Sequence, residues 1–187
     1  MGIRLLIWNS LYKWYVKLFG NKDDRRLRYK TAICLIFKDE APFLQEWIEY
    51  HHLIGIEHFY LYNNNSTDNY EEVLKPYIDK GLVTLIDWPQ EHSQRQAYHN
   101  AWKSFKQECN WICFLDADEF ICLRNYANIN EWLEKFSKFP SVHIYWRMFG
   151  TSGVIHHDFD KLVIEQYTSC WESLFYHGKN FINTRFD

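Results

Sequence analysis

Two aspartates separated by one residue, Asp116 and Asp118, follow directly after a short apolar run over 111–115. The length of this run and its aromatic and branched side chains are typical of a buried central strand in an α/β sheet. In an extended segment the two carboxylates point to the same side while Ala117 turns away, so they could bind Mg²⁺ or Mn²⁺ together with the phosphates of a substrate. Because Asp is also a common turn and helix-cap residue, an acidic loop without a metal is the alternative.

The residues before this motif predict an alternation of strands and helices. Thr31–Phe37 is typical of a second buried strand, and Pro42 lies near the start of a helix that should end at about Gly55. The patterns then predict a strand over 58–62, a turn over 63–68, a helix over 70–79 that Pro76 could kink, a strand over 82–86, and a helix that Ser93 caps and that carries Ala97, Ala101 and Phe105. This order predicts a mostly parallel sheet with helices on both faces, and such sheets bind ligands beyond the carboxyl ends of their strands.

Four segments occur in the order that is seen in glycosyltransferases of the GT-A fold. They are Phe37–Glu40 after the first strand, Asn63–Asp68 after the second, Gln94–Asn100 on the helix before the aspartate motif, and Asp116–Asp118. Over Thr31–Gly153 the chain resembles the large family 2 of these enzymes and the related family 92-like bacterial enzymes. Its loop over 146–153 is similar to one that borders the sugar site there. Family 2 members typically have an acidic pair and a glycine in place of Asn63, Asn64 and Asn65, so recognition of base and ribose would differ in detail.

The resemblance implies transfer of a sugar from a nucleotide-diphosphate donor, most simply a UDP-sugar, to a hydroxyl of a glycan or lipid-linked acceptor in surface polysaccharide assembly. The departing nucleoside diphosphate would need Mn²⁺ or Mg²⁺ as a Lewis acid. Asp118 is expected to bind this ion directly, and Asp116 to contact the ribose or to reach the ion through water. The further residues expected to bind the donor are Lys38, Asp39, Glu40, Asn63, Asn65 and Arg95. Asp39 could instead cap the next helix, and Arg95 could lie on a solvated helix face.

An inverting transfer, which the resemblance favours, also needs a general base for the acceptor hydroxyl. Asp158 and Glu165 are the candidates, with Glu172 as a third, because they follow the Gly150–Gly153 loop on the expected acceptor side. A carboxylate at such a position is more often a surface residue than a catalytic base, and this is the alternative for each. Lys179, after the last predicted strands, could reach a diphosphate, but we expect it to be an exposed cation.

Composition indicates one compact α/β domain over 31–187. The chain has 187 residues, of which 47% are hydrophobic and 19% aromatic, and the aromatic excess is compatible with stacking on sugars and bases. The formal net charge of −3 argues against a nucleic-acid-binding protein. Five cysteines without a CxxC pair predict a reduced, cytoplasmic protein without disulfides or structural zinc.

The first twenty residues predict an amphipathic helix, which a basic linker joins to the domain from residue 31. One side of this helix would gather Ile3, Ile7, Leu11, Trp14 and Leu18, and another Asn9, Ser10, Lys13 and Lys17. Such a helix could lie in the membrane interface or pack on the domain or on another subunit. We predict peripheral association of residues 1–20 with the inner face of the cell membrane. We also expect a short or C-terminally truncated member of the family, because relatives usually continue through further helices.

Two other functions are compatible with these patterns. A nucleotidyltransferase has a similar sheet and paired carboxylates, but it would be expected to carry a glycine-rich phosphate loop after the first strand, and Phe37–Glu40 contains no glycine. A catalytically silent nucleotide-sugar-binding module would keep the fold while the chemistry, and with it the metal dependence, is lost.

Overall fold

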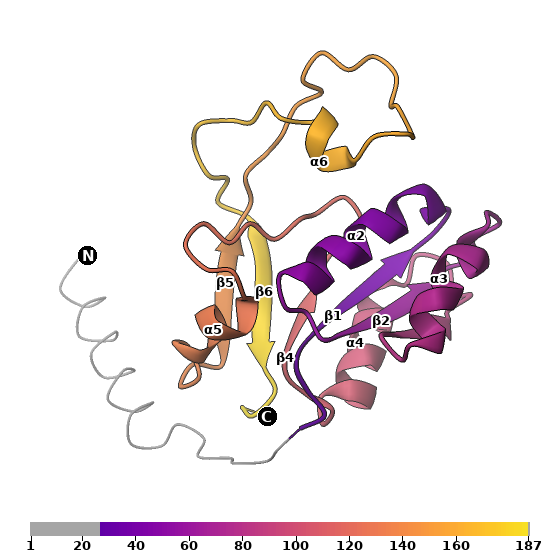
Figure 1. The fold of residues 1–187 in the computed structure, drawn as a ribbon. Coiled ribbons are helices and arrows are strands. Elements are labelled where there is room, and N and C mark those ends of the chain that lie inside the picture. Colours follow the sequence, from indigo (N-terminus) through magenta and orange to yellow (C-terminus); the bar gives the residue numbers. More distant parts are fainter. Residues whose placement is uncertain (1–26, 187) are drawn as a thin grey trace.

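The computed structural model describes residues 27–186, so the predicted helix over 1–20 and most of the basic linker lie outside the described residues. Six strands form one sheet in the order β3-β2-β1-β4-β6-β5 (Figure 1). The strands are β1 (Tyr29–Phe37), β2 (His58–Asn63), β3 (Val83–Asp87), β4 (Cys109–Phe114), β5 (Ser141–Tyr145) and β6 (Gly178–Asn183). The helices are α2 (Ala41–Leu53), α3 (Tyr70–Asp79), α4 (Gln94–Phe105), α5 (Ile129–Glu134) and α6 (Val163–Gln166). Within residues 27–186 each predicted strand and helix is present, with ends that lie within two residues of the prediction.

Helices cover both faces of the parallel strands, as the sequence predicted. On one face Ile33 and Leu35 of β1 share an apolar cluster with Trp47 of α2, Leu74 of α3 and Leu133 of α5. The opposite face packs against α4, in a second cluster that includes Ala32, Cys34, Tyr60, Tyr62, Ala97 and Ala101. The alternation of side chains along β1 therefore sends neighbouring residues into separate cores.

Two local expectations about the helices need correction. Ser93 is the N-cap residue of α4, but its side chain does not cap the helix; its hydroxyl donates to the Gln90 oxygen and accepts from Trp88 Nε1. The first helical N–H of α2 is not capped by Asp39, because Ala41 N donates to Asp68 Oδ2 at 2.8 Å. The loop after β2 thus supports the start of α2.

β6 enters the sheet between β4 and β5 and runs antiparallel to both. Because Cys113 of β4 pairs with Phe181, the beginning of β6 lies beside the end of β4. This pairing brings a segment from the far end of the chain to the carboxyl edge of the parallel strands. Between β5 and β6 the chain leaves the sheet as an arm, residues 146–150 and 169–177, whose two sides are joined by main-chain hydrogen bonds: Trp146 N donates to the His177 oxygen, and Trp171 N donates to the Met148 oxygen.

The segment between the two sides of this arm returns to α2. Glu46 of α2 accepts hydrogen bonds from Val163 N at 2.7 Å and from Ile164 N at 3.2 Å. Phe43, one turn earlier, contacts the rings of His157 and Phe159. Residues 155–167 are therefore attached beside the start of α2, which follows the end of β1 (Figure 1).

All five cysteines are unpaired. Cys34 and Cys113 are buried within their strands, and this burial was predicted. Between residues 27 and 186, none of the helices is both long and apolar enough to cross a membrane.

Candidate active site

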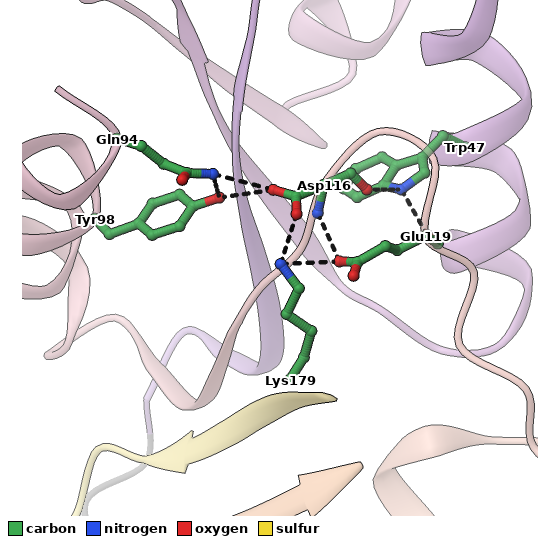
Figure 2. A network of polar contacts seen from close by, with 6 residues as sticks. All are labelled: Trp47, Gln94, Tyr98, Asp116, Glu119 and Lys179. Atoms are coloured by element: carbon green, nitrogen blue, oxygen red, sulfur yellow. Dashed lines mark hydrogen bonds and ion pairs between the residues drawn. The ribbon is translucent and has the colours of Figure 1, made fainter. Parts of the chain in front are cut away.

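The carboxylate of Asp116, just beyond the end of β4, is held by side chains from two other elements (Figure 2). Its Oδ1 accepts hydrogen bonds from Gln94 Nε2 at 3.1 Å and from the Tyr98 hydroxyl at 3.3 Å, both on α4. Its Oδ2 lies 2.7 Å from the Nζ of Lys179 on β6. Burial, and then the charge of Asp116, raise the pKa of Tyr98, so its hydroxyl remains a donor. Asp116 is thus fixed in orientation although 40% of its side chain is exposed.

The segment after Asp116 is a tight turn, and the expectation of an extended strand end is wrong. Glu119 N donates to the Asp116 oxygen at 3.2 Å, and Asp116 N donates to Glu119 Oε2 at 2.9 Å. The buried Trp47 of α2 lies with its Nε1 3.1 Å from the Asp116 oxygen and 3.0 Å from the Glu119 oxygen. The main-chain groups of Asp116 and Glu119 lie beyond the end of the strand, and their hydrogen bonds are formed within the turn and with Trp47. Ala117 faces the core, and Asp118 is exposed at the tip.

Lys179 is not the exposed cation that we expected. Its side chain is 16% exposed, and its Nζ lies 3.1 Å from Glu119 Oε2 as well as 2.7 Å from Asp116. Burial by itself would lower the pKa of Lys179, but the hydrogen bonds and charges of the two carboxylates outweigh burial and raise it. The antiparallel placement of β6 explains the difference, because it brings Lys179 to the end of β4.

Several carboxylates gather beyond the end of β1. Burial, followed by the charges of Asp118, Asp68 and Asp39, raises the pKa of Glu40. Asp39 has a positive φ of 56° and accepts from Thr67 N at 2.7 Å, a hydrogen bond that lowers the pKa of its carboxyl. Lys38, the basic neighbour in this segment, is exposed. The ends of β1 and β4 thus form an acidic edge that Asp118 shares with Glu40.

The asparagines at the end of β2 and directly after it form hydrogen bonds that stabilise this loop. Asn63 is buried; its Nδ2 donates to the Tyr70 hydroxyl, and its Oδ1 accepts from Ser66 N. Asn65 is exposed, has a positive φ of 57° and donates to the Pro89 oxygen at 2.9 Å. These contacts set the shape of the loop next to Asp39, to which Ser66 is also bonded.

Arg95 lies on a different side of α4 from Gln94 and Tyr98. It lines a surface hollow of about 440 Å³ with residues that include Trp88, His99 and Lys103. Within residues 27–186 no carboxylate lies within ion-pair distance of its guanidinium. The structure therefore does not bring Arg95 into the network around Asp116.

The candidate general bases lie on the segment attached to α2 and on the arm. Asp158 forms an ion pair with Lys161 at 3.1 Å, and the hydrogen bond from Lys161 is the largest cause that lowers the pKa of its carboxyl. Glu165 belongs to α6 and is exposed, and Glu172 is exposed on the arm. The contacts of Phe43 and Glu46 place residues 157–164 beside the same end of α2 as Glu40.

Asp118 is the carboxylate of this edge that is available to a divalent ion. Within residues 27–186 no group of three or more His, Cys, Asp or Glu side chains could hold a metal ion. Sites that bind metal with a substrate diphosphate need only one or two carboxylates, since phosphates and water supply the other ligands. Asp118 is exposed, forms no hydrogen bond or ion pair with another described residue, and adds to the negative charge around Glu40.

Sequence reasoning missed several residues that organise the site. Gln94 and Tyr98 are spaced four apart on a helix, within a segment that was already singled out, so their shared face could have been recognised. Glu119 follows the aspartate motif directly. Lys179 could not be assigned without the pairing of β6 with β4.

Comparisons with known proteins agree with this architecture. The sequence profile of glycosyltransferase family 92 matches residues 29–184. A family 92 protein of Oryza sativa subsp. japonica is 32% identical over 123 residues, which cover 65% of this chain and 21% of that protein. Galactan beta-1,4-galactosyltransferase GALS2 of Arabidopsis thaliana is 32% identical over 138 residues, covering 65% of this chain and 27% of that protein. The chain thus spans only about a fifth to a quarter of these relatives.

The fold is that of GT-A nucleotide-sugar transferases. A crystal structure of S. aureus TarS in complex with UDP matches with a TM-score of 0.50 and 15% identity, over 69% of this chain and 38% of that chain. This likeness concerns the fold alone. With the profile match over nearly all described residues, the chain belongs to glycosyltransferase family 92.

Proposed function

We propose that the chain catalyses, or forms the donor-binding part of a protein that catalyses, transfer of a sugar from a UDP-sugar to a hydroxyl of a glycan or lipid-linked acceptor. The observation that carries this proposal is the turn from Asp116 to Glu119, which α2, α4 and β6 hold at the carboxyl edge of the parallel strands. Nucleotide ligands bind at this edge of α/β sheets. Support comes from the family, from the shared fold with TarS, whose crystals contain UDP, and from GALS2, whose name describes a galactosyltransferase.

The charge of the site indicates why a metal would be needed. A nucleoside diphosphate is an anion, and it would approach an edge that carries Asp118, Glu40 and Asp39. A cation must offset this repulsion. We propose that Asp118 binds Mn²⁺ or Mg²⁺ directly, which when bound supplies a Lewis acid for the diphosphate leaving group.

The protein's own residues would position the donor. Asp116 is held by Gln94, Tyr98 and Lys179 and so presents a fixed acceptor for a ribose hydroxyl, in line with the expected role of this aspartate. The loops after β1 and β2 would lie around base and ribose, through Lys38, Asp39, Glu40, Asn63 and Asn65. Arg95 lies outside the network around Asp116, so its expected contact with the donor stays a prediction.

The acceptor would enter beside the segment over 155–167. A general base works best when its pKa lies near the working pH. Among the candidates, the ion pair with Lys161 makes Asp158 a weak base, whereas Glu165 has no such partner within residues 27–186. We therefore place Glu165 ahead of Asp158 for an inverting transfer. We further propose that residues 1–20 attach the protein to the cytoplasmic face of a membrane that carries lipid-linked acceptors.

The direct test is turnover. The full chain is incubated with Mn²⁺, a set of UDP-sugars and β-galactan oligosaccharides, and both UDP release and chain extension are measured by mass spectrometry. We expect extension by the wild type with at least one UDP-sugar, and none after chelation or with Asp118→Asn. UDP binding without extension of any acceptor would instead support a silent module. Flotation on anionic liposomes tests the membrane proposal, and protein that remains in the soluble fraction would contradict it.

A further inference from the structure

The ammonium of Lys179 lies between two carboxylates of the site. Its Nζ is 2.7 Å from Asp116 Oδ2 and 3.1 Å from Glu119 Oε2, and both Lys179 and Glu119 are largely shielded from water, with side chains 16% and 17% exposed (Figure 2). The ring of Trp146, whose centroid is 5.7 Å from Nζ, adds attraction for the positive charge. Lys179 is thus a built-in cation of this edge.

This position conflicts with metal binding by Asp116. A divalent ion that bridged Asp116 and Glu119 would need the place that the ammonium occupies, and two cations so close repel strongly in a partly buried site. The other carboxylate oxygen of Asp116, Oδ1, already accepts hydrogen bonds from Gln94 and Tyr98. Asp118, two residues further along, has no ion pair with another described residue. The two aspartates of the motif therefore differ in their availability to a metal.

We propose that Lys179 is the permanent counter-ion of Asp116 and Glu119, and that by occupying these carboxylates it directs a divalent cation to Asp118. Lys179 is then a positioning residue, which fixes Asp116 for contact with the donor and keeps the metal off it. The meaning of this arrangement for the donor rests on the proposed function. The cation preference itself can be measured without any nucleotide.

Three substitutions of Lys179 separate its charge from its hydrogen bonds. Lys179→Met removes both, Lys179→Gln keeps a donor without the charge, and Lys179→Arg keeps both. Mn²⁺ is titrated calorimetrically into each full-length variant and into the wild type, without nucleotide. Loss of the charge leaves two adjacent carboxylates free, so the Mn²⁺ affinity should rise by about tenfold or more in the Met and Gln variants. It should stay at the wild-type value in the Arg variant.

Two controls identify the new binding site. Lys75→Met removes an exposed ion pair with Asp79 on α3, where Nζ and Oδ2 are 3.1 Å apart, and should not change Mn²⁺ binding. Adding Glu119→Gln to Lys179→Gln should remove the gain, because only one of the two freed carboxylates remains charged. Thermal unfolding shows which variants are folded; if Lys179→Met is not, the comparison of the Gln and Arg variants decides.

An unchanged or weaker Mn²⁺ affinity in the folded neutral variants, or an equal rise in the Arg variant, would overturn the proposal. A separate titration of UDP with Mn²⁺ keeps the two proposals apart. Failure of the wild type to bind UDP would remove the proposed function and leave the result on Lys179 standing. Binding of UDP by the wild type, together with no gain in Mn²⁺ affinity in the neutral variants, would remove only the role of Lys179.

Discussion

The indole Nε1 of Trp47 lies 3.1 Å from the main-chain oxygen of Asp116, across 69 residues of sequence. The same N–H lies 3.0 Å from the Glu119 oxygen. One buried side chain of α2 therefore holds both ends of the turn that carries Asp118. The position of the acidic motif depends on the packing of α2 against the sheet as well as on the motif's own residues.

Trp47→Phe should weaken both the fold and the site. The smaller ring leaves a cavity and leaves two main-chain oxygens without this donor, so the free energy of unfolding should fall by about 2 kcal/mol or more. Affinity for UDP should fall as well, because the turn is no longer fixed. Urea unfolding and UDP titration measure the two effects. Trp132→Phe, which alters contacts with Phe136 and Phe181 instead, should lower stability only; equal loss of UDP affinity in both variants would contradict this account.

Tyr98→Phe tests the hold on Asp116 from α4. It removes the hydroxyl that lies 3.3 Å from Asp116 Oδ1, and UDP affinity should fall several-fold, which corresponds to about 1 kcal/mol. Tyr62→Phe is the matched control, since the Tyr62 hydroxyl donates to Asn100 of the same helix at 2.7 Å and does not contact Asp116. The control should lose stability and keep its UDP affinity. An unchanged affinity in Tyr98→Phe would exclude a contribution of this hydrogen bond.

Stability should fall in acid because of buried histidines. Burial lowers the pKa of His51 and of His58 from 6.5 to about 4. Below pH 6.5 the unfolded chain takes up protons that the folded protein does not, so stability is lost as the pH falls towards 4. Between pH 7 and pH 5 the free energy of unfolding should drop by about 2 kcal/mol for each histidine. Between pH 7 and pH 5, the free energy of unfolding of His51→Gln, measured in urea, should drop by about 2 kcal/mol less than that of the wild type, which is the contribution of one histidine. The same drop as in the wild type would contradict the assignment.

Glu46→Ala should release the segment over 155–167. It removes the carboxylate that accepts from Val163 N and Ile164 N, while the rest of α2 is unchanged. Tryptic cleavage after Lys161 should become several-fold faster, because local opening exposes the chain. Glu49→Ala, on the same helix, removes only the acceptor of the Tyr77 hydroxyl and should leave this cleavage rate unchanged. Equal rates in the wild type and Glu46→Ala would show that this contact does not hold the segment.

The parallel part of the fold could be predicted because its strands and helices are encoded locally. Ile33 and Leu35 alternate with Ala32 and Cys34 along β1, and α2, α3 and α4 carry their buried residues at the helical spacing. The position of β6 could not be predicted, since pairing between strands distant in sequence leaves no local pattern. The turn after β4 was also not predicted, because the extended conformation of the strand was expected to continue to Asp118, whereas the strand ends at Phe114.

The site was predictable only where its residues follow a strand. The acidic motif and the segment after β1 were found in this way, and the fold places both at one edge of the sheet. The partners of Asp116 come from α4 and β6, and their roles depend on three-dimensional packing. The burial of Lys179 could not be predicted, since a lysine in a sequence is expected to be exposed until its neighbours in the fold are known.

The central claim, a metal-dependent donor site built on Asp118, is tested most directly by calorimetric titration of UDP with and without Mn²⁺. The wild type should bind UDP with Mn²⁺ and much more weakly after chelation, and Asp118→Ala should lose the metal-dependent part of this affinity. Asp79→Ala, which removes an exposed carboxylate on α3, should behave as the wild type. UDP binding that is equal with and without Mn²⁺, or unchanged in Asp118→Ala, would contradict the claim.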